Sequence, residues 1–142
     1  MRLAQGLECT CDRFRQVARL LSRHYDGFFV ECGISIGQFG LLVRIAATPG
    51  ESISWIAERL KMERTTLTRN LAPLREAGYV VLGPGSDRRS RSLRLTPTGE
   101  RTLKAALPRW KAAQKDLEQR IGTRRKERLH REIDDLLDRL GN

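Results

Sequence analysis

The sequence has no long hydrophobic run. None of its 142 residues belongs to an apolar stretch long enough to cross a bilayer, and no hydrophobic signal-peptide core follows Met1. We therefore expect a cytoplasmic protein that has no membrane partner. Cysteine is also scarce, and the odd number of three cysteines argues against a disulfide framework and favours reduced thiols.

The residue patterns that carry catalysis or bind metals are missing too. The chain has two histidines, and it contains no Cys-x-x-Cys or His-x-x-x-His pair with metal-ligand spacing. We find no nucleophile with a base and an orienting group, no glycine-rich phosphate loop and no paired carboxylates. The sequence therefore predicts that the protein is not an enzyme and has neither a metal site nor a cofactor.

Acidic residues are outnumbered, with 17 Asp and Glu against 27 Lys and Arg and a formal net charge of +10. Of the 27 basic residues 22 are arginine, whose planar guanidinium suits phosphate groups and guanine edges better than lysine does. The excess is largest over residues 101–131, where eleven basic and three acidic residues give a net charge of +8. This composition indicates a polyanion partner such as nucleic acid, and a solvated surface without such a partner is the alternative.

Apolar residues recur at helical spacing through most of the chain. From residue 7 to 28 they step alternately by four and three, which is a heptad stripe and predicts a helix packed along another helix. Ser35 and Gln38 form a capping-box pair in front of a second helix, which Thr48-Pro49-Gly50 ends. The pattern further predicts helices over 53–60 and 64–77, followed by strands over 79–82 and 92–96 that the break "GPGS" separates. A long helix capped by Thr98 and kinked at Pro108 comes next, and a last helix begins after 122–123.

The central helices and the strands together predict a winged helix-turn-helix. On the helix over 64–77, three leucines define a buried face, and Thr65 and Arg69 point the other way with Thr66 and Thr68 at the flanks. Small hydroxyl side chains let a helix approach base edges closely, and Arg69 can reach a guanine or a phosphate. An ordinary solvated face would carry a Lys/Glu mixture, which "RTTLTRN" lacks.

The hairpin is unusually basic in the stretch "GSDRRSRSLRLTPTGE", residues 85–100. Arginines at the tip of a hairpin can enter the narrow, negative minor groove beside the major groove that the helix occupies. Asp87 can orient Arg89 through a charge-assisted hydrogen bond. The sequence thus predicts a DNA interface, with candidate contacts at Arg64, Thr65, Thr66, Thr68, Arg69, Asp87, Arg88, Arg89 and Arg91.

The same stretches resemble the MarR family. "SDRRSRSLRLTPTGE" is similar to that family's wing signature, Asp-x-Arg followed by Leu-x-Leu-Thr and a glycine, here Asp87, Arg89, Leu93, Leu95, Thr96 and Gly99. "IAERLKMERTTLTRNLAPLREAGYV" resembles its helix-turn-helix, and "ISIGQFGLLVRIA" resembles the helix before it. The resemblance covers nearly the whole chain.

The resemblance implies a mainly α fold, an α+β winged helix, in a single domain over 1–142. Residues 35–97 would form the DNA-binding lobe, and 1–34 with 98–142 the dimerisation helices. The family implies a homodimeric and usually repressing regulator that binds double-stranded DNA at a pseudo-palindromic operator. A small-molecule effector or an oxidant would lower its affinity for DNA. The terminal helices have no obvious core of their own, which also favours packing between two subunits.

A second resemblance concerns the first helix. The organic-hydroperoxide-sensing branch of the family carries a reactive cysteine followed by a tyrosine fourteen residues later, as Cys11 and Tyr25 are here. About 21 Å would separate the two along one helix, so they could meet only across a dimer. Arg15 stands where that branch has a second tyrosine. In the sensor interpretation Cys9 would act as the resolving thiol; in the alternative, Cys11 is a small apolar residue of the helix seam.

Two further questions stay open at the level of sequence. A nonspecific architectural DNA-binding protein is the alternative to a sequence-specific regulator, because the basic stretch 101–131 lies outside the recognition elements. A ligand pocket, if the chain has one, would lie between the dimer helices and the DNA-binding lobe. Four aromatic residues are candidates both for its lining and for the core: Phe14, Phe39, Trp55 and Trp110.

Overall fold

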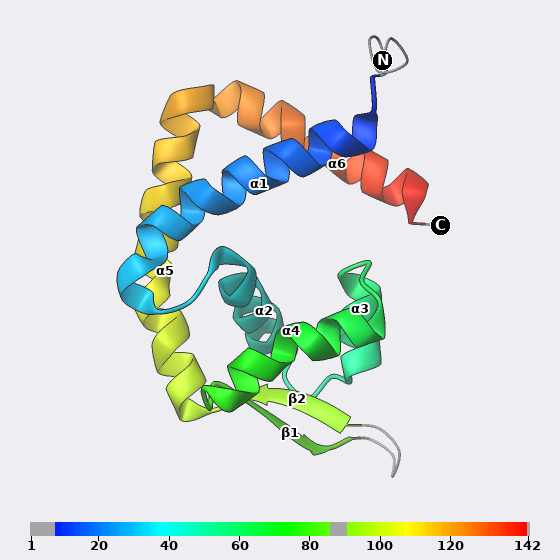
Figure 1. The fold of residues 1–142 in the computed structure, drawn as a ribbon, viewed down its shortest axis with the longest axis vertical. Helices are drawn as coiled ribbons and strands as arrows, with labels where there is room; N and C mark the ends of the chain where they lie inside the picture. The colour runs from blue at the N-terminus through cyan, green and yellow to red at the C-terminus, as the bar shows by residue number, and fades with distance from the viewer. Residues whose placement is uncertain (1–7, 86–90, 142) are drawn as a thin grey trace, which may run out of the picture.

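The computed structural model describes residues 8–85 and 91–141. Along the chain it contains α1 (Thr10–Phe29), the 3₁₀ turn η2 (Val30–Cys32), α2 (Ile36–Ala47), α3 (Ile53–Arg59), α4 (Arg64–Glu76), β1 (Val80–Pro84), β2 (Arg91–Leu95), α5 (Pro97–Ile121) and α6 (Thr123–Leu140). In Figure 1, α1 and α6 cross in an upper lobe, α2, α3, α4 and the hairpin form a lower lobe, and α5 runs along one side of both. The predicted mainly α fold with a winged helix-turn-helix core is confirmed.

Local capping explains where the central helices begin. The Ser35 hydroxyl accepts from the Gln38 amide at 3.1 Å while the Gln38 side chain accepts from the Ser35 amide at 2.9 Å, so the predicted capping box is present. Ser52 caps α3 in the same way, accepting from the Trp55 amide at 3.1 Å. Both caps satisfy amide groups that a helix start leaves without intrahelical partners.

The start of α5 differs from the prediction. Thr96, not Thr98, is the N-cap, and its hydroxyl accepts from the Gly99 amide at 3.0 Å. Pro97 takes the first helical position, where its fixed φ and missing N–H cost nothing, and this places the cap one residue before it. Thr98 already lies within the first turn, where its hydroxyl accepts from Arg101. The helix then continues through Pro108 and changes direction along its length (Figure 1).

The hairpin is longer than predicted. β1 and β2 pair antiparallel from Val80 opposite Leu95 to Pro84 opposite Arg91. Gly83 and Pro84 therefore belong to the strand rather than to the break that "GPGS" suggested. Proline is compatible with this place because it closes the ladder at the end of a strand.

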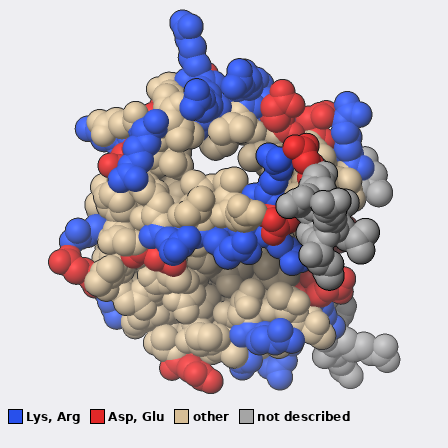
Figure 2. All heavy atoms as spheres, turned by 45° about the horizontal axis from the view of Figure 1, so that its top comes forward, with Lys and Arg blue, Asp and Glu red and all other residues tan. Residues whose placement is uncertain are grey.

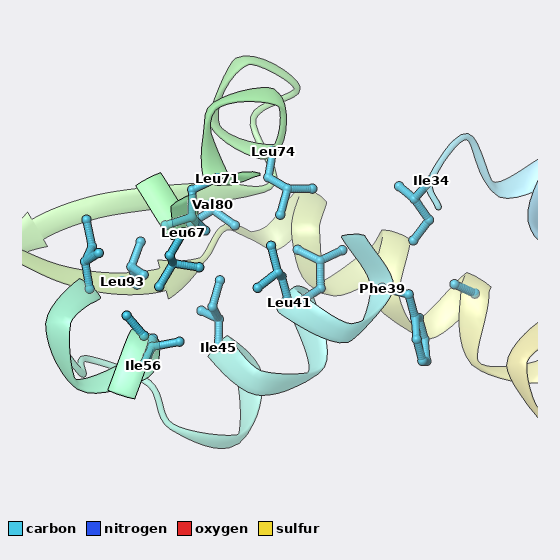
Figure 3. Close-up of a cluster of buried hydrophobic side chains, with 14 of the residues drawn as sticks. Ile34, Phe39, Leu41, Ile45, Ile56, Leu67, Leu71, Leu74, Val80 and Leu93 are labelled. Atoms are coloured by element: carbon cyan, nitrogen blue, oxygen red, sulfur yellow. The ribbon is translucent and has the colours of Figure 1, made fainter. Parts of the chain in front are cut away.

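The core lies in the lower lobe and connects it to α1 and α5. The side chains of Ile45, Ile56, Leu67, Leu74 and Leu93 converge there from α2, α3, α4 and β2 (Figure 3), and all five are fully buried. A row of aromatic rings continues this core toward the upper lobe. Phe39 lies 5.2 Å from Phe29 of α1 and 6.2 Å from Trp110 of α5, measured between ring centroids. Within the described ranges no single helix is long and apolar enough to cross a membrane. The segment Thr10–Cys32 reaches the necessary length and apolar content only when it is taken together with α2, and a bend of 77° separates the two.

Candidate nucleic-acid interface

The helix-turn-helix is held by its buried leucines and by the turn between α3 and α4. Leu67, Leu71 and Leu74 of α4 are at most 1% exposed, as the helical wheel predicts. In the turn, Lys61 has a φ of 52°, an uncommon conformation for a residue other than glycine. The Met62 amide donates to the carbonyl oxygen of Ala57 at 2.9 Å and so fixes this turn. The buried leucines and this turn together hold α4 in place, so that the face opposite the leucines is exposed to solvent.

That outer face carries the side chains that were predicted to read DNA. Arg64, Thr65, Thr68 and Arg69 are exposed and Thr66 is half-buried at the flank. The Thr68 hydroxyl donates its proton to the Arg64 carbonyl at 2.9 Å, so the hydroxyl oxygen can still accept a hydrogen bond. The structure therefore leaves four of these five residues open to solvent, with Thr65 and Arg69 on the face opposite the leucines.

Asn70 joins this surface and was missed in the sequence-based prediction. Its side chain is exposed next to Arg69, with the amide nitrogen 3.9 Å from the sulfur of Met62. An asparagine amide can both donate to and accept from an adenine edge. Its position at the end of "RTTLTRN" was the available signal.

The base of the wing is reinforced by a segment that the sequence did not predict to be part of the sheet. The Gly50 amide donates to the Leu93 carbonyl at 3.0 Å, the Leu93 amide donates to the Glu51 carbonyl at 2.9 Å, and Ser52 forms a bridge with Ser92. Residues 50–52 thus extend the sheet beyond β2. This backing makes β2 a firm base for the basic hairpin.

Two arginines project from this base. Arg91 and Arg94 are both exposed on β2. The Arg94 guanidinium lies over Gly50, where a Cβ atom would stand 2.7 Å from its nitrogen, and Gly50 has a φ of 86°. The segment 50–52 therefore leaves room for Arg94 beside the wing. Arg94 was not among the predicted contacts. The sequence around Arg94 gives no sign that Gly50 lies beside it in the fold.

The tip of the wing lies outside the described residues. Asp87, Arg88 and Arg89 fall in the segment 86–90, so their roles stay predictions. The strand ends on either side, Pro84 and Arg91, pair with each other.

The second half of the wing signature has a structural reason. Besides capping α5, the Thr96 hydroxyl donates to the Gly78 carbonyl, and the Thr96 amide donates to the Tyr79 carbonyl at 3.0 Å. Gly99 is buried against the same backbone, where a Cβ would come within 2.1 Å of the Tyr79 carbonyl oxygen. Threonine and glycine at this spacing thus hold the hairpin against the first turn of α5.

A groove runs between α2 and α4 with a cavity volume of about 570 Å³. Its walls include Gly40 and Arg44 of α2, Arg69 and Pro73 of α4 and Met62 of the turn before α4, and its lining contains no acidic residue. Arg69 therefore belongs both to the groove and to the outer face of α4. The groove has the charge to receive an anion with an apolar body.

The four aromatic residues that were candidates for a ligand pocket do not gather in one. Phe39 and Trp110 stack in the core, and Trp55 packs against the core beneath the Arg59 guanidinium, which lies 4.5 Å from the ring centroid. Phe14 is exposed on α1, far along the helix from Phe29. For Phe39, Trp55 and Trp110 the structure supports the core interpretation that the sequence left open.

Of the candidate redox residues, Cys9 and Cys11 lie close together in sequence at the start of α1, whereas Tyr25 lies toward the other end of that helix. Cys9 and Cys11 are exposed at the start of α1, and Cys32 is half-buried after its end. The Tyr25 hydroxyl donates to the Gln114 side chain of α5, and burial raises the pKa of Tyr25 despite the opposing charge of Lys126. Among the residues that the structure describes, no group of three His, Cys, Asp or Glu side chains is placed to hold a metal ion.

Comparison with known proteins places this geometry in context. Residues 33–90 match the model of the MarR family. The chain is similar to the M. tuberculosis transcriptional regulator MosR, solved in complex with DNA, at 35% identity over 91% of this chain and 93% of that one, with a TM-score of 0.82. It is also 32% identical over 91 residues to a putative transcriptional regulatory protein for the hcr operon of Thauera aromatica, a match that covers 63% of this chain. The matched region spans about half, 51%, of that relative's length.

The fold alone extends to more distant regulators. The transcriptional repressor CouR has been solved bound to a 23-mer DNA duplex, with 22% identity, a TM-score of 0.81 and coverage of 96% of this chain and 97% of that one. It has also been solved bound to p-coumaroyl-CoA, with 21% identity, a TM-score of 0.82 and coverage of 94% and 96%.

Proposed function

Because the chain belongs to the MarR family of transcriptional regulators, we propose that it acts as a homodimeric repressor at a pseudo-palindromic DNA operator. Its family and fold are those of DNA-binding transcription regulators, not of enzymes. Binding to chromosomal DNA would place the protein in the cytoplasm, in line with the sequence-based expectation.

One observation carries this proposal. The face of α4 opposite its buried leucines presents threonines and Arg69 to solvent, and the reinforced base of the wing presents Arg91 and Arg94 nearby in the same lobe. A helix with small hydroxyl side chains fits the major groove, and guanidinium groups beside it fit phosphates or the adjacent minor groove. Two such lobes related by a dimer axis would bind half-sites about 34–36 Å apart.

Selection of binding sites from a random duplex library tests sequence specificity. We expect an inverted repeat to emerge, and we expect the selected duplex to outcompete random duplex by at least about 10³ at fixed salt. Arg69→Ala should cost about 1–3 kcal/mol of specific binding without changing thermal stability, because a guanidinium contact to a base or phosphate is lost. Lys104→Ala, an exposed lysine on α5, is the control. Equal binding to selected and random DNA would instead support the architectural alternative.

We further propose that the groove between α2 and α4 binds a small anionic effector. Arg44 and Arg69 both line it, and a ligand anion that engages Arg69 would withdraw it from DNA. Release by thiol oxidation at Cys11 is the second candidate, supported by its exposure on α1. A titration of operator DNA with protein, with and without each compound, separates the two candidates. Arg44→Gln should abolish the loss of DNA affinity caused by small organic anions, and Cys11→Ser should abolish the loss caused by mild peroxide. A peroxide response that survives in Cys11→Ser would exclude that thiol as the switch.

A further inference from the structure

The strongest positive charge of the chain lies away from the proposed DNA interface. Residues 101–131 carry a net charge of +8, and this excess continues into the first turns of α6. Four exposed arginines there form what we call the apex arginine face: Arg124, Arg125, Arg128 and Arg131. In Figure 1, α6 lies at the end of the molecule opposite the hairpin, and Figure 2, which brings this end forward, shows basic side chains gathered over it. A duplex held by α4 and the wing does not account for this charge.

The helical wheel keeps these arginines on the solvent side of α6. At 100° per residue the four lie within an arc of about 120°, and Ile133 and Leu137 lie on the opposite side, with Leu129 beside Arg125 at the border between the two. The apolar side is the one that a second subunit would cover. The apex arginine face therefore stays accessible in the proposed dimer, and it spans roughly 10 Å along the helix from Arg124 to Arg131.

The four arginines are not used to hold the fold. In the described part of the chain none of them forms an ion pair, whereas Arg109, Arg120 and Lys126 in the same region pair with Glu31, Asp116 and Glu118. All four are arginine rather than lysine, and the guanidinium fork can bind two phosphate oxygens at once. The face therefore has free donors arranged for a polyanion.

We propose that the apex arginine face binds the phosphate backbone of a second DNA duplex. Double-stranded DNA carries one negative charge per about 1.7 Å, so a row of guanidinium groups can neutralise several phosphates and release their counterions. A dimer would carry two such faces, and a protein bound to its operator could then bridge to another DNA segment. This activity goes beyond operator binding and would not depend on the sequence of the second duplex.

The arrangement favours DNA over an anionic membrane. A helix that lies on a membrane places apolar residues at the boundary, with its basic residues flanking them. Here Ile133 and Leu137 point away from the arginines, and of the four only Arg125 borders the apolar stripe, so most of the face offers charge without an apolar anchor. A membrane is therefore an outcome of the test rather than the proposal.

A bead assay tests bridging with the full-length protein. A biotinylated random-sequence duplex is immobilised, protein is added, and a second, fluorescent random duplex follows after washing. Protein retained on the bead reports the first contact, and fluorescence reports the second. We expect wild type to capture the second duplex, and R124Q/R125Q/R128Q/R131Q to retain protein while capturing at least about ten-fold less. The matched control removes four exposed charges from α5 instead, in R101Q/K104Q/K111Q/K115Q, and should still capture the duplex.

Several results would overturn the proposal. Wild-type protein that stays on the bead without capturing the second duplex excludes bridging, and so does equal loss in the α6 variant and the α5 control. If the α6 variant is misfolded by circular dichroism, the double variant R124Q/R128Q replaces it under the same criteria. Tighter binding of wild type to phosphatidylserine vesicles than to the second duplex assigns the face to membranes. Failure of the proposed operator function is seen separately, as absence of protein from the bead or of sequence preference in the library selection.

Discussion

At the scale of single residues, Gly99 shows how one position is decided by a neighbour far along the chain. It lies within a helix, where alanine normally has the higher propensity. Yet a Cβ there would stand 2.1 Å from the Tyr79 carbonyl oxygen, closer than atoms approach in real structures. Close packing of α5 against the hairpin therefore outweighs helix propensity at this position.

We expect Gly99→Ala to lower the free energy of unfolding by about 1–3 kcal/mol, because the backbone must shift to relieve the overlap. Gly27→Ala is the matched control: Gly27 is exposed within α1 and has nothing within 4 Å of its built Cβ. That substitution should be stabilising by about 0.5–1 kcal/mol. Urea unfolding of both variants measures the contrast. A stabilised Gly99→Ala would contradict the close packing of α5 on the hairpin.

At the scale of elements, the junction between α5 and α6 depends on one carboxylate. Gly122 turns the chain with a φ of 86°, and the Lys126 ammonium donates to Glu118 across the turn at 3.0 Å. Hydrogen bonds from the Thr123 hydroxyl and from Lys126 hold the pKa of Glu118 below its ordinary value of 4.5. The ionised carboxylate therefore contributes to holding the junction between α5 and α6.

This junction should make stability depend on pH in the acidic range. Since the pKa of Glu118 is lower in the folded protein than in the unfolded chain, the carboxylate adds to the free energy of unfolding above about pH 4.5. This contribution is lost as the pH falls through the pKa of the folded state. We expect Glu118→Gln to be less stable than wild type near neutral pH and the difference to shrink in acid. Urea unfolding at about pH 7 and about pH 3 measures this. Glu127→Gln, at an exposed position of α6 that forms no ion pair within the described residues, should show no such pH dependence.

At the scale of the whole molecule, one chain leaves apolar surface uncovered on both terminal helices. Phe14, Val17 and Leu20 of α1 are 46–59% exposed, and Ile133 and Leu137 of α6 are 38% and 49% exposed. Figure 2 shows an opening between the upper lobe and the rest of the chain. The Lys61 ammonium donates to the Gly141 carbonyl at 3.3 Å. Stripes of exposed apolar side chains on two helices are typical of a subunit interface.

We therefore expect a dimer by light scattering at micromolar concentration. I133D/L137D should shift the mass to that of a monomer and weaken binding to a palindromic duplex far more than to a half-site, because a charge in the interface has no partner. Val43→Asp, at an exposed apolar position of α2 outside both stripes, should leave the dimer intact. A wild-type monomer would exclude the proposed arrangement of two recognition helices.

The sequence by itself determined the features that depend on neighbours within a turn or two. The buried leucines of α4, the caps at Ser35 and Ser52 and the order of the elements all follow from helical and strand periodicity and from local hydrogen bonds. The same periodicity placed Thr65 and Arg69 on the outer face of α4, with Thr66 and Thr68 at its flanks.

Only the tertiary structure decided what depends on segments that meet across the fold. It joined residues 50–52 to β2, set Arg94 over Gly50, and brought Arg44 and Arg69 to one groove. It also made Thr96 rather than Thr98 the N-cap of α5, because the Thr96 hydroxyl both donates to the Gly78 carbonyl and accepts from the Gly99 amide. Such contacts leave no periodic trace in the sequence, because their partners are fixed by packing of the core rather than by spacing along the chain.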